Sequence, residues 1–349
     1  MAADTYCQIN IGGEDVTADI LPYLQELTTT DEAGGTADSC EVTLNDAGGI
    51  ISLPTRGDPV TVLLGDVHGI SLVFTGTVDD VKSSGSKGDG MKLVVSAKSA
   101  DTNSKVKEPK QKHWDDKSLK DVAGEAAQLA GLEGCDVADS LASITRPYWA
   151  MQLESFLHFG ERMAREVGGT FKVVGKKAII ADRNGGTSVS GKALPTFSAV
   201  RPGNLMSWEV SPTIGRPRFK QAKVRHYDVK AAQWKTESVD ISIDDAVSGF
   251  TDRQVAADQG EAQQRGKSHK KNAEREQGGG SITVNGTTVP QPEGLVVLSG
   301  ARPGVDGTYR INSVVQTFTK DAGWTTRLDL KQPQGDAGKD KRKSKRKHK

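Results

Sequence analysis

The chain has 349 residues, a length that suits two or three domains and permits a substantial buried core. Aromatic residues make up only 5% of it and glycine is abundant at 39 residues, a composition that favours strands and tight turns. The net charge of +1 conceals a split, because the last eleven residues hold eight Lys or Arg and one acidic residue, against 38 basic and 44 acidic residues elsewhere. The overall charge therefore says little about partners, and the basic C-terminus has to be weighed as a segment of its own.

Three scattered cysteines, Cys7, Cys40 and Cys135, have no CxxC spacing and so indicate neither a disulfide framework nor a zinc site. The N-terminus shows no basic segment followed by an apolar run, which argues against a signal peptide. No apolar stretch approaches the ~20 residues that a membrane span needs. We therefore expect a protein that is made and folded in a reducing cytosol and does not insert into a membrane.

Alternating apolar and polar residues predict about six strands and no helix in the first hundred residues. Such a run of short strands suggests a closed sheet, because closure removes exposed strand edges. Residues 82–90 are expected to form a loop. The predicted strands cover residues 7–11, 21–30, 40–44, 60–64, 72–81 and 91–97.

A helix-containing block is predicted at the middle of the chain, after a polar linker over residues 101–117. Ser118 and Ser155 are good N-caps, since each hydroxyl can accept from a free amide of the first helical turn. The apolar spacing then predicts one helix to residue 130 and a second to residue 167, each ended by glycine. A short hairpin is expected to follow over residues 171–181.

The second half returns to strand patterns after a Gly/Ser/Thr-rich linker over residues 184–203. Residues 252–277 are mainly helix-forming with few apolar side chains, which predicts an exposed helix with a weak apolar stripe. Asn285-Gly286 predicts a two-residue hairpin between strands at 282–284 and 287–289. The other strands are expected at residues 205–210, 221–227, 234–243, 295–298, 308–318 and 324–330.

Two parts of the sequence repeat one pattern. Residues 60–65 (VTVLLG) parallel residues 295–300 (LVVLSG), and residues 91–97 parallel residues 324–330, with offsets between 233 and 235 residues. We interpret this as one barrel plan written twice, with the helical block between the copies. The predicted domains are a first barrel over 1–105, a small α+β domain over 106–190, a second barrel with a long helix-containing connection over 191–333, and a basic disordered tail over 334–349.

No enzymatic site is expected. The six histidines show no HExxH or paired spacing, and Glu154, Glu161 and Glu166 lie on or beside one predicted helix, where solvated carboxylates are the default. The glycine pairs lack the GxxxxGK and GxGxxG patterns of phosphate-binding loops, so they indicate turns. We therefore expect no catalytic residues, no cofactor and no metal.

The basic C-terminus is a candidate contact for phosphate backbones, because clustered Lys and Arg release counterions on binding whatever the nucleotide sequence. A solvated, disordered terminus is the simpler interpretation, since blocks of like charge repel and do not fold. No aromatic residues are interleaved, so base stacking is not indicated. The residues of the possible polyanion contact are Lys341, Arg342, Lys343, Lys345, Arg346, Lys347 and Lys349.

Four segments, in this order, resemble the late control protein D family of contractile-tailed phages, the baseplate hub proteins. They are the helix over 118–132, the Gln-Leu-Glu-Ser run at 152–155 with its helix and Gly168-Gly169, the region 208–227 with Arg218 and Val224, and the Gly-Thr-Tyr-Arg-Ile run at 307–311 with the strands up to residue 330. The sequence departs from the family pattern at three positions. Phe156 replaces an acidic residue, Gly160 a large apolar one and Gln316 a histidine.

The resemblance implies a mainly β protein with an α+β insert: two tail-tube-like antiparallel β-barrels plus a small helix-and-hairpin domain, assembled as a homotrimer around a channel. Three chains with two barrels each would offer six similar faces, so a sixfold tail tube could meet a threefold spike. The expected partners are further copies of the chain, the tail spike, tail tube, baseplate wedge and tape-measure proteins, and phage DNA in a polar, acidic-leaning channel. The expected location is the tail baseplate of the virion, assembled in the host bacterial cytoplasm.

A nucleic-acid-binding protein that acts through the basic C-terminal tail is the alternative function. In a tail particle the same segment could contact phage DNA or an acidic neighbouring protein. A late-gene regulator has no support in the residues, since no helix-turn-helix with a basic recognition helix is present in the pattern. The sequence leaves open whether the source is a phage, a bacteriocin or a secretion device, which loops touch spike, tube or wedge, and whether trimerisation needs the spike.

Overall fold

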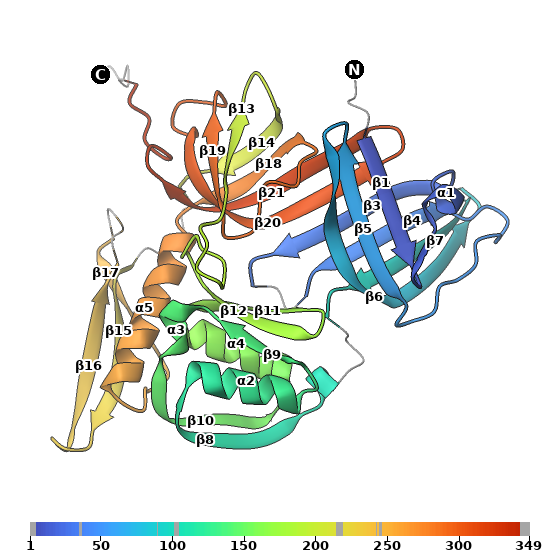
Figure 1. The fold of residues 1–349 in the computed structure, drawn as a ribbon. Helices are drawn as coiled ribbons and strands as arrows, with labels where there is room; N and C mark the ends of the chain where they lie inside the picture. Colours follow the sequence, from blue (N-terminus) through green and yellow to red (C-terminus); the bar gives the residue numbers. More distant parts are fainter. Residues whose placement is uncertain are drawn as a thin grey trace.

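The computed structural model describes residues 5–34, 37–88, 90–100, 105–213, 219–241, 243 and 246–342. Figure 1 shows three parts: an N-terminal set of strands in blue, a C-terminal set mostly in orange and red, and a green helix-containing block below them. Each part has its own cluster of buried apolar side chains. The cluster of the N-terminal set also includes Phe318 and Trp324, so C-terminal strands complete its core.

The N-terminal strand set has the hydrogen-bonded order β3-β4-β7-β6-β5-β1-β2. Strand alternation decides which side chains are buried: on β5, Val60, Val62 and Leu64 lie in the core, while Thr61 and Leu63 between them are half-buried. The elements are β1 Thr5–Ile11, β2 Glu14–Asp15, α1 Thr17–Ile20, β3 Leu24–Glu32, β4 Ser39–Asn45, β5 Pro59–Asp66, β6 Gly69–Ser86 and β7 Gly90–Lys98.

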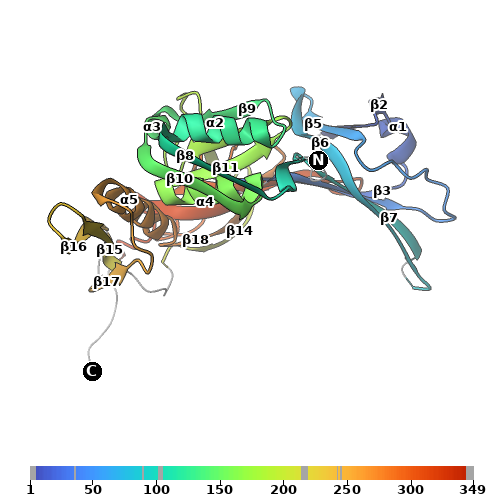
Figure 2. The ribbon, with the colours of Figure 1, turned by 90° about the horizontal axis from the view of Figure 1, so that it is seen from below.

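Two expectations for this set were wrong. A single-turn helix, α1, stands where no helix was expected. Residues 82–90 are mostly strand, because β6 and β7 continue their pairing as far as Ser86 and Gly90 and leave only a tight turn. Figure 2 shows the resulting long hairpin reaching away from the rest of the molecule. Its outer half is polar and exposed, which is why the apolar alternation that marks a strand is missing there.

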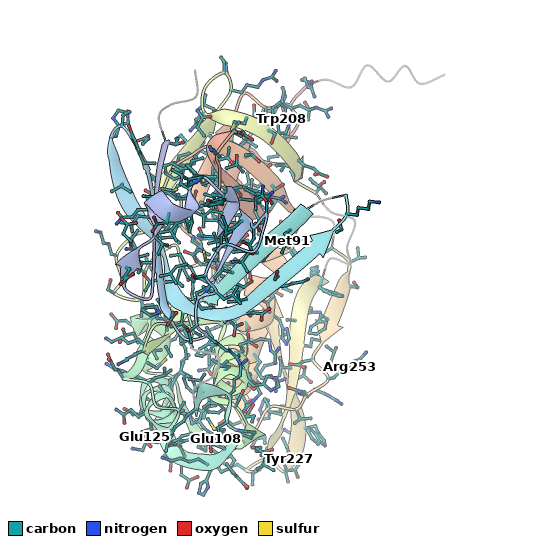
Figure 3. The ribbon with its side chains drawn as sticks, turned by 90° about the vertical axis from the view of Figure 1, so that its right-hand side faces the viewer. Met91, Glu108, Glu125, Trp208, Tyr227 and Arg253 are labelled. Carbon is teal, nitrogen blue, oxygen red and sulfur yellow. The ribbon has the colours of Figure 1, made fainter. Side chains whose placement is uncertain are left out.

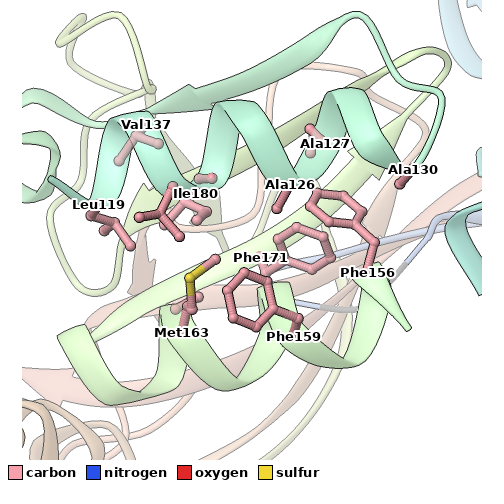
Figure 4. Close-up of a cluster of buried hydrophobic side chains, with 14 of the residues drawn as sticks. Leu119, Ala126, Ala127, Ala130, Val137, Phe156, Phe159, Met163, Phe171 and Ile180 are labelled. Carbon is pink, nitrogen blue, oxygen red and sulfur yellow. The ribbon is translucent and has the colours of Figure 1, made fainter. Parts of the chain in front are cut away.

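The central block packs α2 and α4 against a three-stranded sheet. Both predicted helices are confirmed with their caps: Ser118 accepts from the Asp121 amide at 3.2 Å, and Ser155 from the His158 amide at 3.3 Å. Figure 4 shows Phe159, Met163 and Phe171 meeting between the helices. The elements are η1 Lys105–Lys107, β8 Lys110–Ser118, α2 Leu119–Leu129, β9 Gly134–Val137, α3 Asp139–Ala142, β10 Thr145–Glu154, α4 Phe156–Val167, β11 Gly169–Val174 and β12 Lys177–Asp182.

The predicted linker over residues 101–117 was wrong for its second half. Strand β8 occupies Lys110–Ser118 and pairs antiparallel with β10, a strand that the sequence did not indicate. All β8 side chains except Trp114 are polar or charged, and Trp114 is the one buried residue of the strand. A strand with a single buried residue has no period-2 apolar pattern, so composition alone resembles a linker.

The C-terminal strand set has the order β14-β18-β21-β20, with β19 and β13 beyond β20. Strand β13 lies in the stretch that was expected to be a linker and pairs parallel with β19. The predicted strand at 287–289 is absent, because the Thr287 amide donates to the Thr326 hydroxyl instead of to a hairpin partner. The elements are β13 Thr196–Val200, β14 Leu205–Ser211, β18 Gly279–Asn285, β19 Leu295–Ser299, β20 Gly307–Thr319 and β21 Gly323–Gln334.

An insert over residues 212–278 separates β14 from β18. It forms a small sheet of β15 Phe219–Asp228, β16 Gln233–Asp240 and β17 Ser248–Thr251, with α5 Gln259–Arg275 beside it (Figure 1). Helix α5 is shorter than predicted, because Asp258 caps it by accepting from the Glu261 amide. The expectation of an exposed helix was also wrong: Ala262, Arg265, Gly266, Ser268 and Arg275 are buried, so small and paired polar residues replace an apolar stripe.

Candidate functional site

The two strand sets repeat one ladder. The N-terminal set runs β3-β4-β7-β6-β5 and the C-terminal set runs β14-β18-β21-β20-β19, with every neighbouring pair antiparallel. The sequence echo at 60–65 and 295–300 falls on β5 and β19, and the echo at 91–97 and 324–330 falls on β7 and β21. The predicted duplication is therefore confirmed in the strand order.

Irregularities in the ladders recur at matching places. A bulge inserts an unpaired residue and bends a strand, so its position is a specific feature of a fold. The ladder of β3 slips between Leu24 and Glu26, and the ladder of β14 slips between Leu205 and Ser207. A second matching pair lies in the long strands, between Val78 and Asp80 on β6 and between Ile311 and Ser313 on β20. With these bulges aligned, β3 matches β14 residue by residue, and so do the second halves of β6 and β20.

The two copies differ in how their first two strands are connected. In the N-terminal set a short loop joins β3 to β4, whereas in the C-terminal set the whole insert over 212–278 joins β14 to β18. The outermost strands differ as well, since β1 runs antiparallel to β5 while β13 runs parallel to β19. The copies are therefore equivalent in their central ladder and distinct at their margins.

The two sets meet edge to edge within the chain. Strand β3 pairs antiparallel with the second half of β20, from Leu27 opposite Phe318 to Glu32 opposite Ser313. This junction, which we call the internal seam, merges both sets into one 13-stranded sheet. Among the described residues no ladder closes either set on itself, so the closed barrels stay a prediction.

One face of the merged sheet is polar along its length. The strand registers place Thr283, Arg327, Val315, Thr30, Ser39 and Lys98 in one row that crosses the internal seam. Hydroxyl side chains dominate this face, and charged residues of both signs, such as Glu41 and Glu209 with Lys92 and Arg327, are interspersed. The face is therefore polar and carries charged residues of both signs.

The loop after β3 docks the N-terminal set onto the central block. Lys172 of β11 makes ion pairs with both Asp31 and Asp38, the second at 2.6 Å. Burial, and next the negative charge of Asp31, raise the pKa of Asp38 to about 6. Two carboxylates therefore share one lysine at this contact, with the proton affinity of one of them increased.

Helix α5 docks the C-terminal set onto the same block from the other side. The Ser268 hydroxyl donates to the carbonyl of Arg165 at 2.5 Å, just before α4 ends. Arg275 pairs with the buried Glu293 at 2.6 Å, and Arg310 donates to the Glu293 carbonyl at 2.6 Å. Both sets thus contact the central block, the N-terminal set through Asp31 and Asp38 and the C-terminal set through α5.

The expected polyanion contact is only partly within the described residues. Lys341 pairs with Asp336 at 3.1 Å, and Arg342 pairs with Asp340. Residues 335–339 fold back onto the C-terminal set, where the Gly338 amide donates to the Gly304 carbonyl, so the predicted tail begins later than residue 334. The other residues of that contact, Lys343, Lys345, Arg346, Lys347 and Lys349, lie outside the described part of the chain.

Burial raises the pKa of all three cysteine thiols. Desolvation raises the pKa of the Cys7 thiol to about 11 and that of the Cys40 and Cys135 thiols to about 12, so all three stay protonated at neutral pH. In the described part of the chain, His, Cys, Asp and Glu form no cluster that could hold a metal ion. None of the described helices is long and apolar enough to span a bilayer.

Three features of the described residues stand out: a duplicated ladder, its internal seam and a polar sheet face. The sequence located both copies of the ladder but missed the seam. No signal in a single sequence could have found it, because the composition of β3 and β20 does not indicate that these two distant strands pair.

Comparison with known proteins agrees with this geometry. The sequence model of the phage tail baseplate hub (GPD) family matches residues 38–322. A probable baseplate hub protein of Escherichia phage P2 is 33% identical over 193 residues, which is 55% of this chain and 49% of that protein. The chain thus spans about half the length of this curated relative.

The fold is shared with solved tail proteins. A tail protein from Neisseria meningitidis MC58 aligns with a TM-score of 0.68 and 16% identity, over 96% of this chain and 98% of that one. The 43 kDa tail protein of prophage MuSo2 from Shewanella oneidensis aligns with a TM-score of 0.69 and 16% identity, over 94% and 98%. Since the family match covers most of the sequence, the chain belongs to the phage tail baseplate hub (GPD) family, as the ordered motifs had indicated.

Proposed function

We propose that the chain is the symmetry adaptor of a contractile tail, a homotrimer that joins a sixfold tail tube to a threefold central spike. The observation that supports this function is the repeated ladder with its matching bulges. Closed rings need repeated interfaces, and three chains with two equivalent ladders each supply six. The internal seam already joins one pair of ladders within each chain.

The differences between the two copies suit the other side of the adaptor. Only the C-terminal set carries the insert over 212–278, so a ring of six ladders would carry an insert on every second one. Such a ring has nearly sixfold symmetry in its ladders. It has only threefold symmetry once the inserts are included. We assign the ladders to the tube protein and the insert-bearing face to the spike or the baseplate wedge.

The polar sheet face is proposed to line the channel. Its hydroxyl-rich rows continue across the internal seam without an apolar patch, so a passing strand of DNA or a tape-measure protein would find no adhesive surface. The interspersed charges of both signs also prevent strong attraction to a polyanion. On this view the chain works through its surfaces and catalyses no reaction.

The mass of the particle in solution tests the adaptor. Multi-angle light scattering of the purified chain, alone and mixed with the spike protein of the same tail, should give a species that contains three copies. Trimerisation only in the mixture would still support the proposal, since a spike can nucleate the ring. A chain that remains monomeric or forms dimers in both samples would contradict it.

A further inference from the structure

One half of strand β6 has an open edge that its counterpart lacks. The first half of β6 pairs with β5 up to Thr77, and Val78 bonds to Gly57 and Asp58 just before β5. Beyond Val78 the described ladders connect β6 only to β7, on the opposite edge. In the C-terminal copy the same edge of β20 is first covered by β19 and then, from Ser313 to Phe318, by β3. The edge that forms the internal seam in one copy is therefore uncovered in the other.

Solvent exposure shows the same contrast. On β20, Gln316 and Phe318 are buried, and Val315 and Thr317 are half-buried. The aligned bulges make Lys82–Gly85 the equivalents of Val315–Phe318, and all four of these β6 residues are exposed. A polar strand edge of this kind is suited to a partner strand that arrives only on assembly.

Strand β14 has the complementary open edge. It is the equivalent of β3, yet among the described ladders it pairs only with β18 and ends the sheet. Leu27 and Thr29 of β3 are buried in the internal seam, whereas their equivalents Trp208, which is labelled in Figure 3, and Val210 are only half-buried. Each chain thus has two open strand edges: β6, which corresponds to β20 of the internal seam, and β14, which corresponds to β3.

We propose that β6 of one protomer pairs antiparallel with β14 of the next, in the register of the internal seam. The equivalences place Gly85 opposite Trp208, Ser84 opposite Glu209, Ser83 opposite Val210 and Lys82 opposite Ser211. The ladder ends there, because Pro212 follows and has no amide to donate. This inference rests on the proposed ring and specifies the contact that closes it.

The side chains of the two edges are complementary in this register. Gly85 leaves room for the indole of Trp208 on the core side, where the internal seam places Phe318 against Leu27. On the polar face Glu209 lies diagonal to Lys82 and near Lys92, which pairs with Ser84 on the neighbouring strand. Diagonal neighbours on a sheet are within reach of long side chains, so opposite charges meet across the seam.

Disulfide trapping tests the register. The matched variant carries Ser83→Cys and Val210→Cys, and the control carries Ser83→Cys with Ser211→Cys, which places the two thiols on opposite faces of the sheet. Mild oxidation of trimeric samples should give covalent trimers on a non-reducing gel for the matched pair only. The wild-type chain, with its three native cysteines, serves as the background.

Charge exchange gives a second readout that needs no new thiol. Lys82→Glu should weaken each contact between protomers about twofold to fivefold, as expected for one exposed ion pair. A closed trimer contains three such contacts, and adding Glu209→Lys in the same chain should restore trimerisation. A trimeric sample in which the matched cysteines fail to cross-link, or in which the exchange gives no restoration, would overturn the seam and leave the adaptor standing. A chain that never trimerises would overturn both.

Discussion

At the scale of single residues, the departures from the family pattern are explained by their neighbours. A Cβ at Gly160 would lie 2.4 Å from a ring carbon of Phe171, so the absence of a side chain is what lets β11 pack on α4. Phe156 meets the edge of the same ring, with centroids 5.6 Å apart. Gln316 is buried and accepts from both the Trp324 indole and the Thr326 hydroxyl, a network that bridges β20 and β21.

The contact at Gly160 predicts opposite effects of one substitution at two helical glycines. Gly160→Ala should destabilise the block by about 1–3 kcal/mol, because a methyl group is forced into a filled core. Gly124→Ala on α2 should stabilise it by about 0.5–1 kcal/mol, since no atom lies within 4 Å of its Cβ and alanine favours the helix. Urea unfolding followed by tryptophan fluorescence measures both, and equal effects would contradict the packing described.

The carboxylate pair at Lys172 predicts a dependence of stability on pH. The folded pKa of Asp38, about 6, lies above its ordinary value, so the folded state holds this proton more tightly than the unfolded chain. The stability that it contributes is complete below about pH 4 and is lost as the pH rises through about 6. The loss cannot exceed about 1.4 kcal/mol per pH unit, the value for one proton.

Asp38→Asn should remove this slope. The variant should gain stability relative to the wild type as the pH rises from 4 to 6.5, in urea unfolding at fixed ionic strength. Asp31→Asn is the matched control, because it leaves Asp38 ionisable and removes the neighbouring negative charge, so the slope should move to lower pH. Identical pH profiles for the wild type and Asp38→Asn would contradict the assignment.

At the scale of elements, the predictions succeeded where a helix or strand buries an apolar face of its own. Helices α2 and α4 were predicted with their caps because Ser118 and Ser155 start regular apolar stripes. Helix α5 has no such stripe, and its contacts are ion pairs and small residues. An exposed helix and a helix buried by polar contacts look alike in sequence, since the partners that neutralise Arg265 and Arg275 lie on other elements.

Strands with polar edges were missed for the same reason. The outer half of β6 and most of β8 are held by backbone hydrogen bonds to a neighbouring strand, and few of their side chains enter a core. Backbone hydrogen bonds leave no trace in the order of side chains. Strand prediction by apolar alternation therefore stops where the strand leaves the core, although the ladder continues.

At the scale of the whole molecule, the chain has two equivalent ladders that contact the same central block. The segments that make the two contacts differ. After β3, Asp38 forms an ion pair with Lys172 of the block, whereas Arg275 of α5 forms an ion pair with Glu293. The insert over residues 212–278 lengthens the connection between β14 and β18 and makes the two copies different. In an assembly of such chains, the ladders can follow a higher symmetry than the outer strands and connections, because only the ladders are equivalent in both copies.

The basic C-terminus is predicted to carry any affinity of the chain for nucleic acid. A chain that ends at Arg342 keeps every described residue and loses Lys343, Lys345, Arg346, Lys347 and Lys349. We expect it to leave short duplex DNA unshifted in a low-salt gel, because the remaining body has an excess of acidic residues. The full-length chain should give a shift that disappears as salt is added.

Equal mobility shifts by the two chains would place the binding in the folded body and favour the nucleic-acid function. The mass and the unfolding midpoint of the shortened chain are the controls, and both should equal those of the full-length chain.

The sequence alone determined which segments form the two ladders, where the helical block lies and how its helices begin and end. Each of these follows from local spacing of apolar residues and from caps, which act over a few residues. Only the tertiary structure decided that β3 joins β20, that α5 is buried and that β6 and β14 are left with open edges. Those outcomes depend on which distant backbones meet, and the hydrogen bonds that join them are made by groups that every residue has in common.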